Sequence, residues 1–301
     1  MHEATDKVRR ARRGLAIFFG VLLLASVPFD VQIVLHGLHP NYFLPLVWVP
    51  CFASVVARFL LREGFGDVSF RLDRRAAWAM LVGVIYPVAV GVPAYGIAWT
   101  TGMAHFEPAA MHPLGFAIPG STPGERLLAG SIIALTLGPL AMAVLALGEE
   151  VGWRGYMLTR LIDARVPQPV LVSGVIWALW HAPLIVAGEY NASPVPMLSL
   201  LLYMVTSVGA GTLLATLRLE TGSVWPAVTM HAAWNAIVVA FFGASTNGED
   251  AALWTGEGGV LVAISTTAIT FVLLRWRRGP GDRARGAGPG PGTSELGAVR
   301  L

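Results

Sequence analysis

The chain has 301 residues, of which 55% are hydrophobic and 13% are charged, and its mean hydropathy is +0.63. A water-soluble globule of this size would need more charge, so the composition indicates one membrane domain with short tails. The net charge of +3 does not indicate a nucleic-acid partner, because the basic residues lie between apolar runs and form no single patch. We expect the lipid bilayer to cover most of the surface.

The first 13 residues form a basic tail, and an apolar stretch begins at Gly14. This arrangement could open a secretory signal peptide. The apolar stretch is long enough to cross a bilayer, however, and it contains no clear small-x-small cleavage site. We therefore predict an uncleaved first membrane span.

Runs of about twenty apolar residues can cross a bilayer, because a helix rises about 1.5 Å per residue and the hydrocarbon core is about 30 Å thick. Such runs lie near residues 14–36, 43–61, 76–100, 127–148, 168–188, 195–217, 223–243 and 258–275. All should be helices, since lipid offers the backbone no hydrogen-bond partner and no run alternates like a barrel strand. The sequence predicts an all-α, polytopic membrane helical bundle of about eight transmembrane helices, spanning residues 14–278.

Short cytoplasmic loops of membrane proteins collect Lys and Arg. If both termini are cytoplasmic, every one of the 21 Lys and Arg residues except Arg126 falls in a tail or an inside loop. Adding or removing one span would destroy this bias, so an even number of spans is predicted. We expect an integral protein of a bacterial plasma membrane with both termini in the cytoplasm, and a disordered Gly-, Pro- and Arg-rich tail at 279–301.

Polar residues within the predicted spans are informative, because a polar side chain at membrane depth is costly and marks a functional site by default. Three groups stand out. They are Glu149, Glu150 and Arg154 at the cytoplasmic end of the fourth span, His181 in the fifth, and His231 with Asn235 in the seventh.

Helical geometry separates the roles of these residues. Residues four apart share a helix face, so Glu150 can pair with Arg154, while Glu149 points about 100° away and has no obvious counter-ion. The same spacing places His231 and Asn235 on one face. Closely spaced glycines at 148, 152 and 155 would let another helix approach this segment.

These side chains would suffice for peptide hydrolysis without a covalent intermediate. A poorly solvated carboxylate such as Glu149 suits a general base that takes a proton from water and gives it to a leaving amine. A histidine across from it could hold the attacking water. A second histidine and an asparagine amide could donate hydrogen bonds to a tetrahedral oxyanion.

Structural interpretations of the same residues stay open. Glu150 and Arg154 could form a solvated interfacial pair, and His181 or His231 alone could be an interhelical hydrogen-bonding residue. The tryptophans of these segments are more typical of interface anchoring and packing than of substrate recognition. They are Trp153, Trp177, Trp180 and Trp234.

In this order, the three groups resemble the CPBP intramembrane proteases, which include the type II CAAX prenyl endopeptidases and the bacterial Abi, bacteriocin-processing proteins. The matching motifs are Glu149-Glu150-x-x-x-Arg154, Trp177-x-x-x-His181 and His231-x-x-x-Asn235. The likeness covers roughly residues 127–243. Its one departure is Trp177, where the family more often has Phe, and we expect this change to alter packing rather than chemistry.

The resemblance implies a protease whose catalytic base is Glu149, supported by Glu150 and Arg154. It implies that His181 holds the water and that His231 with Asn235 forms the oxyanion side. The implied substrate is a membrane-associated protein or peptide.

Metal dependence is the open point of this resemblance, since family members have been described both as glutamate proteases and as metalloproteases. Glu149, His181 and His231 would also make the two-His, one-carboxylate ligand set of a catalytic zinc. We favour no metal cofactor, because the sequence has no H-E-x-x-H pair and no second ligand at helical spacing from His181.

Two other functions compete with an intramembrane endopeptidase. A transporter would use the same buried polar groups as an ion path, but it predicts inverted repeats and the two halves of the chain show no similarity. A non-catalytic scaffold or immunity protein should tolerate decay of a motif, and none has decayed. A single site also requires the fourth span to tilt or start later than residue 127, with a water-filled cavity open to the cytoplasm.

Overall fold

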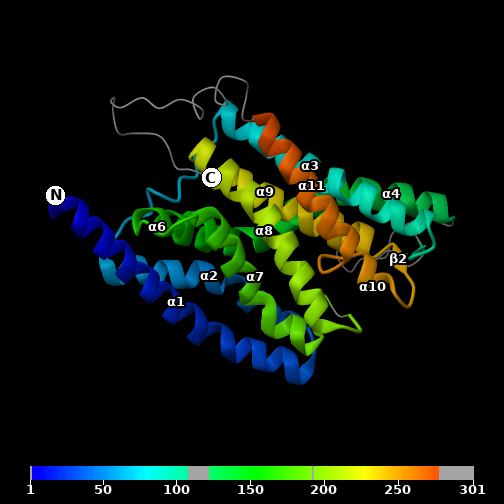
Figure 1. The fold of residues 1–301 in the computed structure, drawn as a ribbon, viewed down its shortest axis with the longest axis horizontal. Helices are drawn as coiled ribbons and strands as arrows, with labels where there is room; N and C mark the ends of the chain where they lie inside the picture. The colour runs from blue at the N-terminus through cyan, green and yellow to red at the C-terminus, as the bar shows by residue number, and fades with distance from the viewer. Residues whose placement is uncertain (1, 108–121, 192, 278–301) are drawn as a thin grey trace.

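The protein is described by a computed structural model that covers residues 2–107, 122–191 and 193–277. The tail at 279–301, for which disorder was predicted, lies outside the described residues. The described chain is a bundle of long helices with one short strand pair (Figure 1).

The long unbroken helices are α1 (His2–His36), α2 (Pro40–Leu61), α3 (Arg74–Thr100), α7 (Pro169–Ala187), α8 (Pro196–Thr221) and α11 (Val260–Arg277). Shorter elements are α4 (Pro123–Leu135), α5 (Leu137–Gly152), α6 (Leu158–Asp163), α9 (Trp225–Trp234) and α10 (Ala251–Trp254). Two segments are π-helical, η3 (Trp153–Met157) and η4 (Asn235–Gly243). Strands β1 (His105–Phe106) and β2 (Thr246–Asn247) pair antiparallel.

Within the described residues, seven helices are long and apolar enough to cross a membrane, and a bent helix pair raises this number to eight. The bent pair consists of α4 and the continuous stretch from Leu137 to Asp163, which meet at 41°. The prediction of an all-α polytopic membrane bundle with about eight spans is therefore confirmed.

The fourth span differs from its predicted bounds of 127–148. The helix breaks at Thr136, which precedes Pro139 in the first turn of α5, and then continues to Asp163. Glu149 consequently lies near the middle of a helical stretch and not at its end. The helix can continue past Glu149 and Glu150 because their carboxylates find partners inside the bundle and do not need bulk solvent.

Close packing of α5 against α2 fixes the position of this segment. A side chain at Gly152 would place its Cβ 2.4 Å from the backbone of Pro50, and one at Gly148 would reach within 2.9 Å of Trp48. The predicted helix approach at these glycines is confirmed. Helix α9 packs against both α3 and α5, so the motifs of α5 and α9 meet in the bundle interior (Figure 1).

The bundle has two ends of different character. At the basic end, ion pairs join the start of α1, the 62–73 loop and the end of α6: Arg10 and Arg160 both bind Glu63, and Lys7 binds Asp163. The opposite end is formed by residues 37–39, 101–107, 188–191, 193–195 and 244–259. There, strand β1 pairs with β2 and Asn191 bonds Glu257.

Candidate active site

A fully buried charge pair lies behind the site. Arg154 donates to Glu150 over 2.7 Å, and both side chains are at most 1% exposed. The predicted pair is confirmed, but it is not a solvated interfacial one. The guanidinium carbon of Arg154 also lies 4.6 Å from the ring centre of Trp177, a cation–π contact that a desolvated site strengthens.

Glu149 has no cationic side chain as a hydrogen-bond donor among its described contacts. Its Oε2 instead accepts from the indole nitrogens of Trp153, at 3.2 Å, and Trp177, at 3.0 Å. Two neutral donors thus hold one carboxylate oxygen and leave the other, Oε1, toward the cavity. The expectation that Trp177 affects packing alone is wrong, because a phenylalanine there would lack this donor.

His231 connects the two adjacent carboxylates. Its Nδ1 lies 2.8 Å from Oε1 of Glu150, and its Nε2 lies 3.9 Å from Oε1 of Glu149. Because Glu150 also binds Arg154, the ionised carboxylate can only accept, so Nδ1 of His231 carries the hydrogen. Nε2 then points toward Glu149 either as a lone pair or, in the imidazolium, as a second donor.

His181 is oriented by its own helix. Its Nδ1 lies 2.9 Å from the carbonyl oxygen of Trp177, which can only accept, so the hydrogen is on Nδ1 and the neutral ring turns a lone pair at Nε2 to the cavity. The ring is packed between aromatic neighbours, with ring centres of Tyr190 and Tyr203 at 5.5 Å and 5.2 Å.

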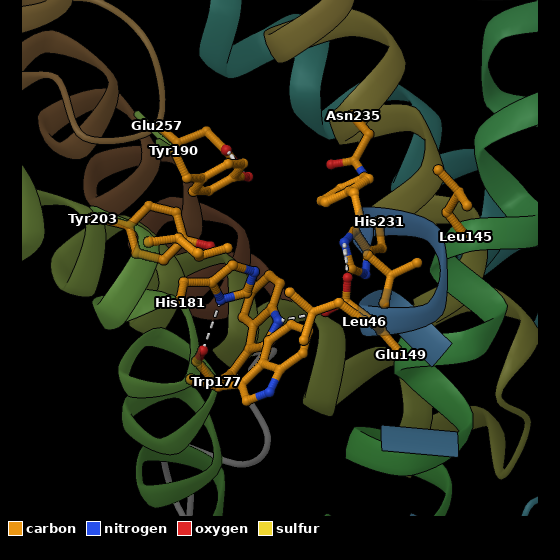
Figure 2. Close-up of a pocket in the computed structure, with 14 residues that line it drawn as sticks. Leu46, Leu145, Glu149, Trp177, His181, Tyr190, Tyr203, His231, Asn235 and Glu257 are labelled. Atoms are coloured by element: carbon orange, nitrogen blue, oxygen red, sulfur yellow. Dashed lines mark hydrogen bonds and ion pairs between the residues drawn. The ribbon is translucent and has the colours of Figure 1, made fainter. Parts of the chain in front are cut away.

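One cavity joins the predicted residues. Glu149, His181, His231 and Asn235 all line it, with His181 facing His231 across the space (Figure 2). The volume open to the centres of water-sized molecules is about 40 Å³, which holds a few waters, since one needs roughly 10–15 Å³. Glu150 and Arg154 do not line it and contact it only through neighbours.

Both motif helices become π-helical at the site. The η3 segment starts directly after α5 and contains Arg154, while η4 starts at Asn235. Single π-helical turns occur frequently at functional sites. In η3, Arg58 of α2 supplies a donor to the carbonyl of Gly155 at 3.1 Å, which ties this segment to the neighbouring helix.

Three cavity residues escaped the sequence analysis as site residues: Tyr190, Tyr203 and Glu257. Glu257 is 7% exposed and accepts from Trp234 Nε1 at 2.7 Å, from Asn191 Nδ2 at 3.2 Å and from the hydroxyl of Tyr190. Nothing in its spacing marks it, since it lies in an acidic loop. Trp153 was detectable, because it follows Glu149 at the same four-residue spacing that pairs Glu150 with Arg154.

The ligand set proposed as an alternative for zinc does not fit. Among the residues that the structure describes, no three His, Cys, Asp or Glu side chains come together as a group that could hold a metal ion. Glu149, His181 and His231 therefore share a cavity without forming a coordination geometry.

The cavity lies toward the opposite end of the bundle. Its lining includes Tyr190 and Glu257 of the end loops and Phe43 near the start of α2. Toward the basic end it is closed by Trp153, Arg154 and Tyr156, each with 0% exposure. The sequence predicted a cavity open to the cytoplasm; these buried side chains lie between Glu149 and the basic end.

The described residues thus form a helical bundle with seven or eight candidate membrane spans, in which a buried carboxylate, two histidines and an amide surround one cavity. In a comparison with protein families, residues 131–237 match the model of the type II CAAX prenyl endopeptidase Rce1-like family. This confirms the resemblance carried by the three motifs, and the matched range contains all six predicted site residues. A search of curated proteins found no match. Glu257 lies outside the matched range.

Proposed function

We propose that the protein is an intramembrane endopeptidase that hydrolyses a peptide bond of a membrane-associated protein or peptide, with Glu149 as the general base. One observation carries the proposal: Oε1 of Glu149 faces a cavity also lined by His181 and Asn235, 3.9 Å from Nε2 of His231. General acid–base catalysis needs a carboxylate oxygen within reach of one water, and this oxygen has no other hydrogen-bond donor among the described residues.

Water activation follows from the hydrogen bonds on either side of the cavity. The two indoles hold Oε2 of Glu149, so Oε1 takes the proton of the water. Nε2 of His181 accepts the second hydrogen of the same water and orients its oxygen toward the scissile carbonyl carbon. The water oxygen bonds to that carbon, and the carbonyl oxygen becomes an oxyanion.

The oxyanion is stabilised from the α9–η4 wall. The side-chain amide of Asn235 is one donor, and Nε2 of protonated His231 is the other. Glu150 supports the imidazolium because its carboxylate accepts from Nδ1, and Arg154 holds Glu150 in place. Glu149 then passes its proton to the amide nitrogen, the C–N bond breaks, and a carboxylic acid and an amine leave without a covalent intermediate.

The test is cleavage of membrane-tethered peptides by the purified protein, with Glu149→Gln as the decisive variant. The amide is nearly isosteric with the carboxylate but cannot act as a base, so cleavage should fall to background while peptide binding and thermal unfolding stay close to wild type. Glu189→Gln is a matched control, because Glu189 does not line the cavity. Full activity of Glu149→Gln would overturn Glu149 as base, and no cleavage of any peptide by wild type would favour a scaffold function.

A further inference from the structure

The residues that line the cavity indicate from which end of the bundle a substrate could enter it. His181 lies six residues before the end of α7 at Ala187, and Tyr203 lies seven residues after the start of α8. At about 1.5 Å per residue, both lie roughly 10 Å from the opposite end. Tyr190 and Glu257 belong to the loops of that end. The α7 and α8 walls of the cavity therefore lead to that end, whereas His231 lies six residues after the start of α9 at Trp225.

The route to the basic end is blocked by a continuous polar and aromatic layer. Glu150, Trp153, Arg154 and Tyr156 all have 0% exposure. The Glu150–Arg154 pair is desolvated, and Glu150 also bonds His231, so opening this layer would break a buried ion pair. A substrate segment entering from the basic end would have to pass through it.

Charge distinguishes the two sides of the membrane. The segments 37–39, 101–107, 188–195 and 244–259 contain no Lys or Arg, but they contain acidic residues at 107, 189, 249, 250 and 257. The basic end holds the arginine-rich loops, and Arg126 at the start of α4 is the exception. Because Lys and Arg accumulate on the cytoplasmic side, the opposite end faces away from the cytoplasm.

We propose that the site takes its substrate from the non-cytoplasmic side of the membrane. The substrate class is then a membrane-anchored protein or peptide whose anchor-proximal segment has already been translocated, and not a segment exposed in the cytoplasm. The proposal rests on the protease function above for its chemistry. A depth of roughly 10 Å corresponds to about three residues of extended chain, so the cleaved bond lies at the junction of the anchor and the translocated part.

Sidedness can be measured without any activity. In a Cys51→Ala background, which removes the single cysteine of the chain, cysteines are introduced at the exposed positions Glu249→Cys and Gly66→Cys. A membrane-impermeant maleimide applied to intact cells should label the Glu249→Cys variant and should label the Gly66→Cys variant only after lysis. The reverse pattern would overturn the proposal.

Substrate sidedness is tested with paired reporters. A library of randomised ten-residue segments joins one transmembrane anchor to a tag, either on the cytoplasmic or on the translocated side, and is coexpressed with wild type or Glu149→Gln. We expect Glu149-dependent cleavage of translocated segments only. Cleavage of cytoplasmic segments alone would overturn the sidedness and leave the protease function standing. Absence of cleavage on both sides would count against the protease function, and the labelling result would still decide the sidedness.

Discussion

The buried layer and the outer wall of the cavity hold carboxylates in different ways. In the layer, Glu150 is bound by Arg154 and His231, so its charge is balanced by the guanidinium of Arg154. On the outer wall, Glu257 is held by neutral donors from Tyr190, Asn191 and Trp234. The Glu150 carboxylate is thus paired with a cation, whereas the Glu257 carboxylate has only neutral hydrogen-bond donors.

Glu149 belongs to the second kind although it is adjacent to Glu150 in sequence. Its two indole donors orient the carboxylate and leave its other oxygen, Oε1, without a hydrogen bond among the described residues. The comparison indicates that the ion pair serves structure and that the neutrally held carboxylates serve the cavity. Four variants test this division.

The largest effect is expected for Arg154→Ala. It leaves Glu150 buried with one partner fewer, and breaking a buried pair costs about 3–5 kcal/mol, far more than the ~0.2–1 kcal/mol of an exposed pair. Thermal unfolding in a defined detergent measures the loss. The double variant Glu150→Gln/Arg154→Ala should recover part of it. If the double variant is no more stable than Arg154→Ala alone, an unpaired charge is not the cause.

The second largest effect is expected when Asn235, the proposed oxyanion donor, is replaced. Asn235→Ala should lower kcat by about 10²–10³-fold with little change in KM, because the donor acts mainly in the transition state. The readout is cleavage kinetics on the tethered peptide. A variant with unchanged kcat would place Asn235 outside the reaction.

Trp177→Phe should have a smaller effect on catalysis. It removes one of the two donors to Oε2 of Glu149, and a hydrogen bond to a charged group contributes about 1.5–3 kcal/mol. We expect kcat to fall by roughly ten- to a hundredfold. Trp180→Phe is the matched control, since that indole lines the same cavity but donates to Ser26. Equal losses in both variants would indicate a packing effect and not the hydrogen bond.

The smallest effect is expected for Tyr190→Phe. Glu257 keeps its bonds to Trp234 and Asn191, and the ring can still stack on His181. Burial, followed by the charge of Glu257, raises the pKa of Tyr190 well above its usual value, so the phenol stays protonated. The stability difference between wild type and Tyr190→Phe should therefore not change between pH 6 and about pH 9, below the unfolded pKa of about 10. A difference that disappears on going from pH 6 to pH 9 would contradict this.

The sequence predicts the parts of this molecule that depend on local periodicity. Apolar runs predict the helices, and the four-residue spacing predicts that Glu150 binds Arg154 and that His231 and Asn235 share a wall. It also predicts that the fourth span must tilt or start late, and the break at Thr136 with the start of α5 at Leu137 fits the later start.

Features that depend on tertiary contacts were not predictable from spacing. The indole of Trp177 reaches Glu149 from 28 positions away. Glu257 is recruited into the cavity by a loop whose acidic composition is typical of a solvated surface. The side to which the cavity faces depends on where α5 and η3 place the buried layer of Glu150, Trp153, Arg154 and Tyr156.

The break at Thr136 separates the depth of the Glu149 carboxylate from the thickness of the bilayer. Of the residues of α4, only Gly130 and Ala134 are buried, whereas α5 is fixed against α2 through Gly148 and Gly152. A thicker or thinner membrane can be matched by a change in the tilt of α4, at a modest cost per ångström of mismatch. Glu149 keeps its depth, so the distance between the membrane surface and the Glu149 carboxylate is set by α5 and not by the lipid.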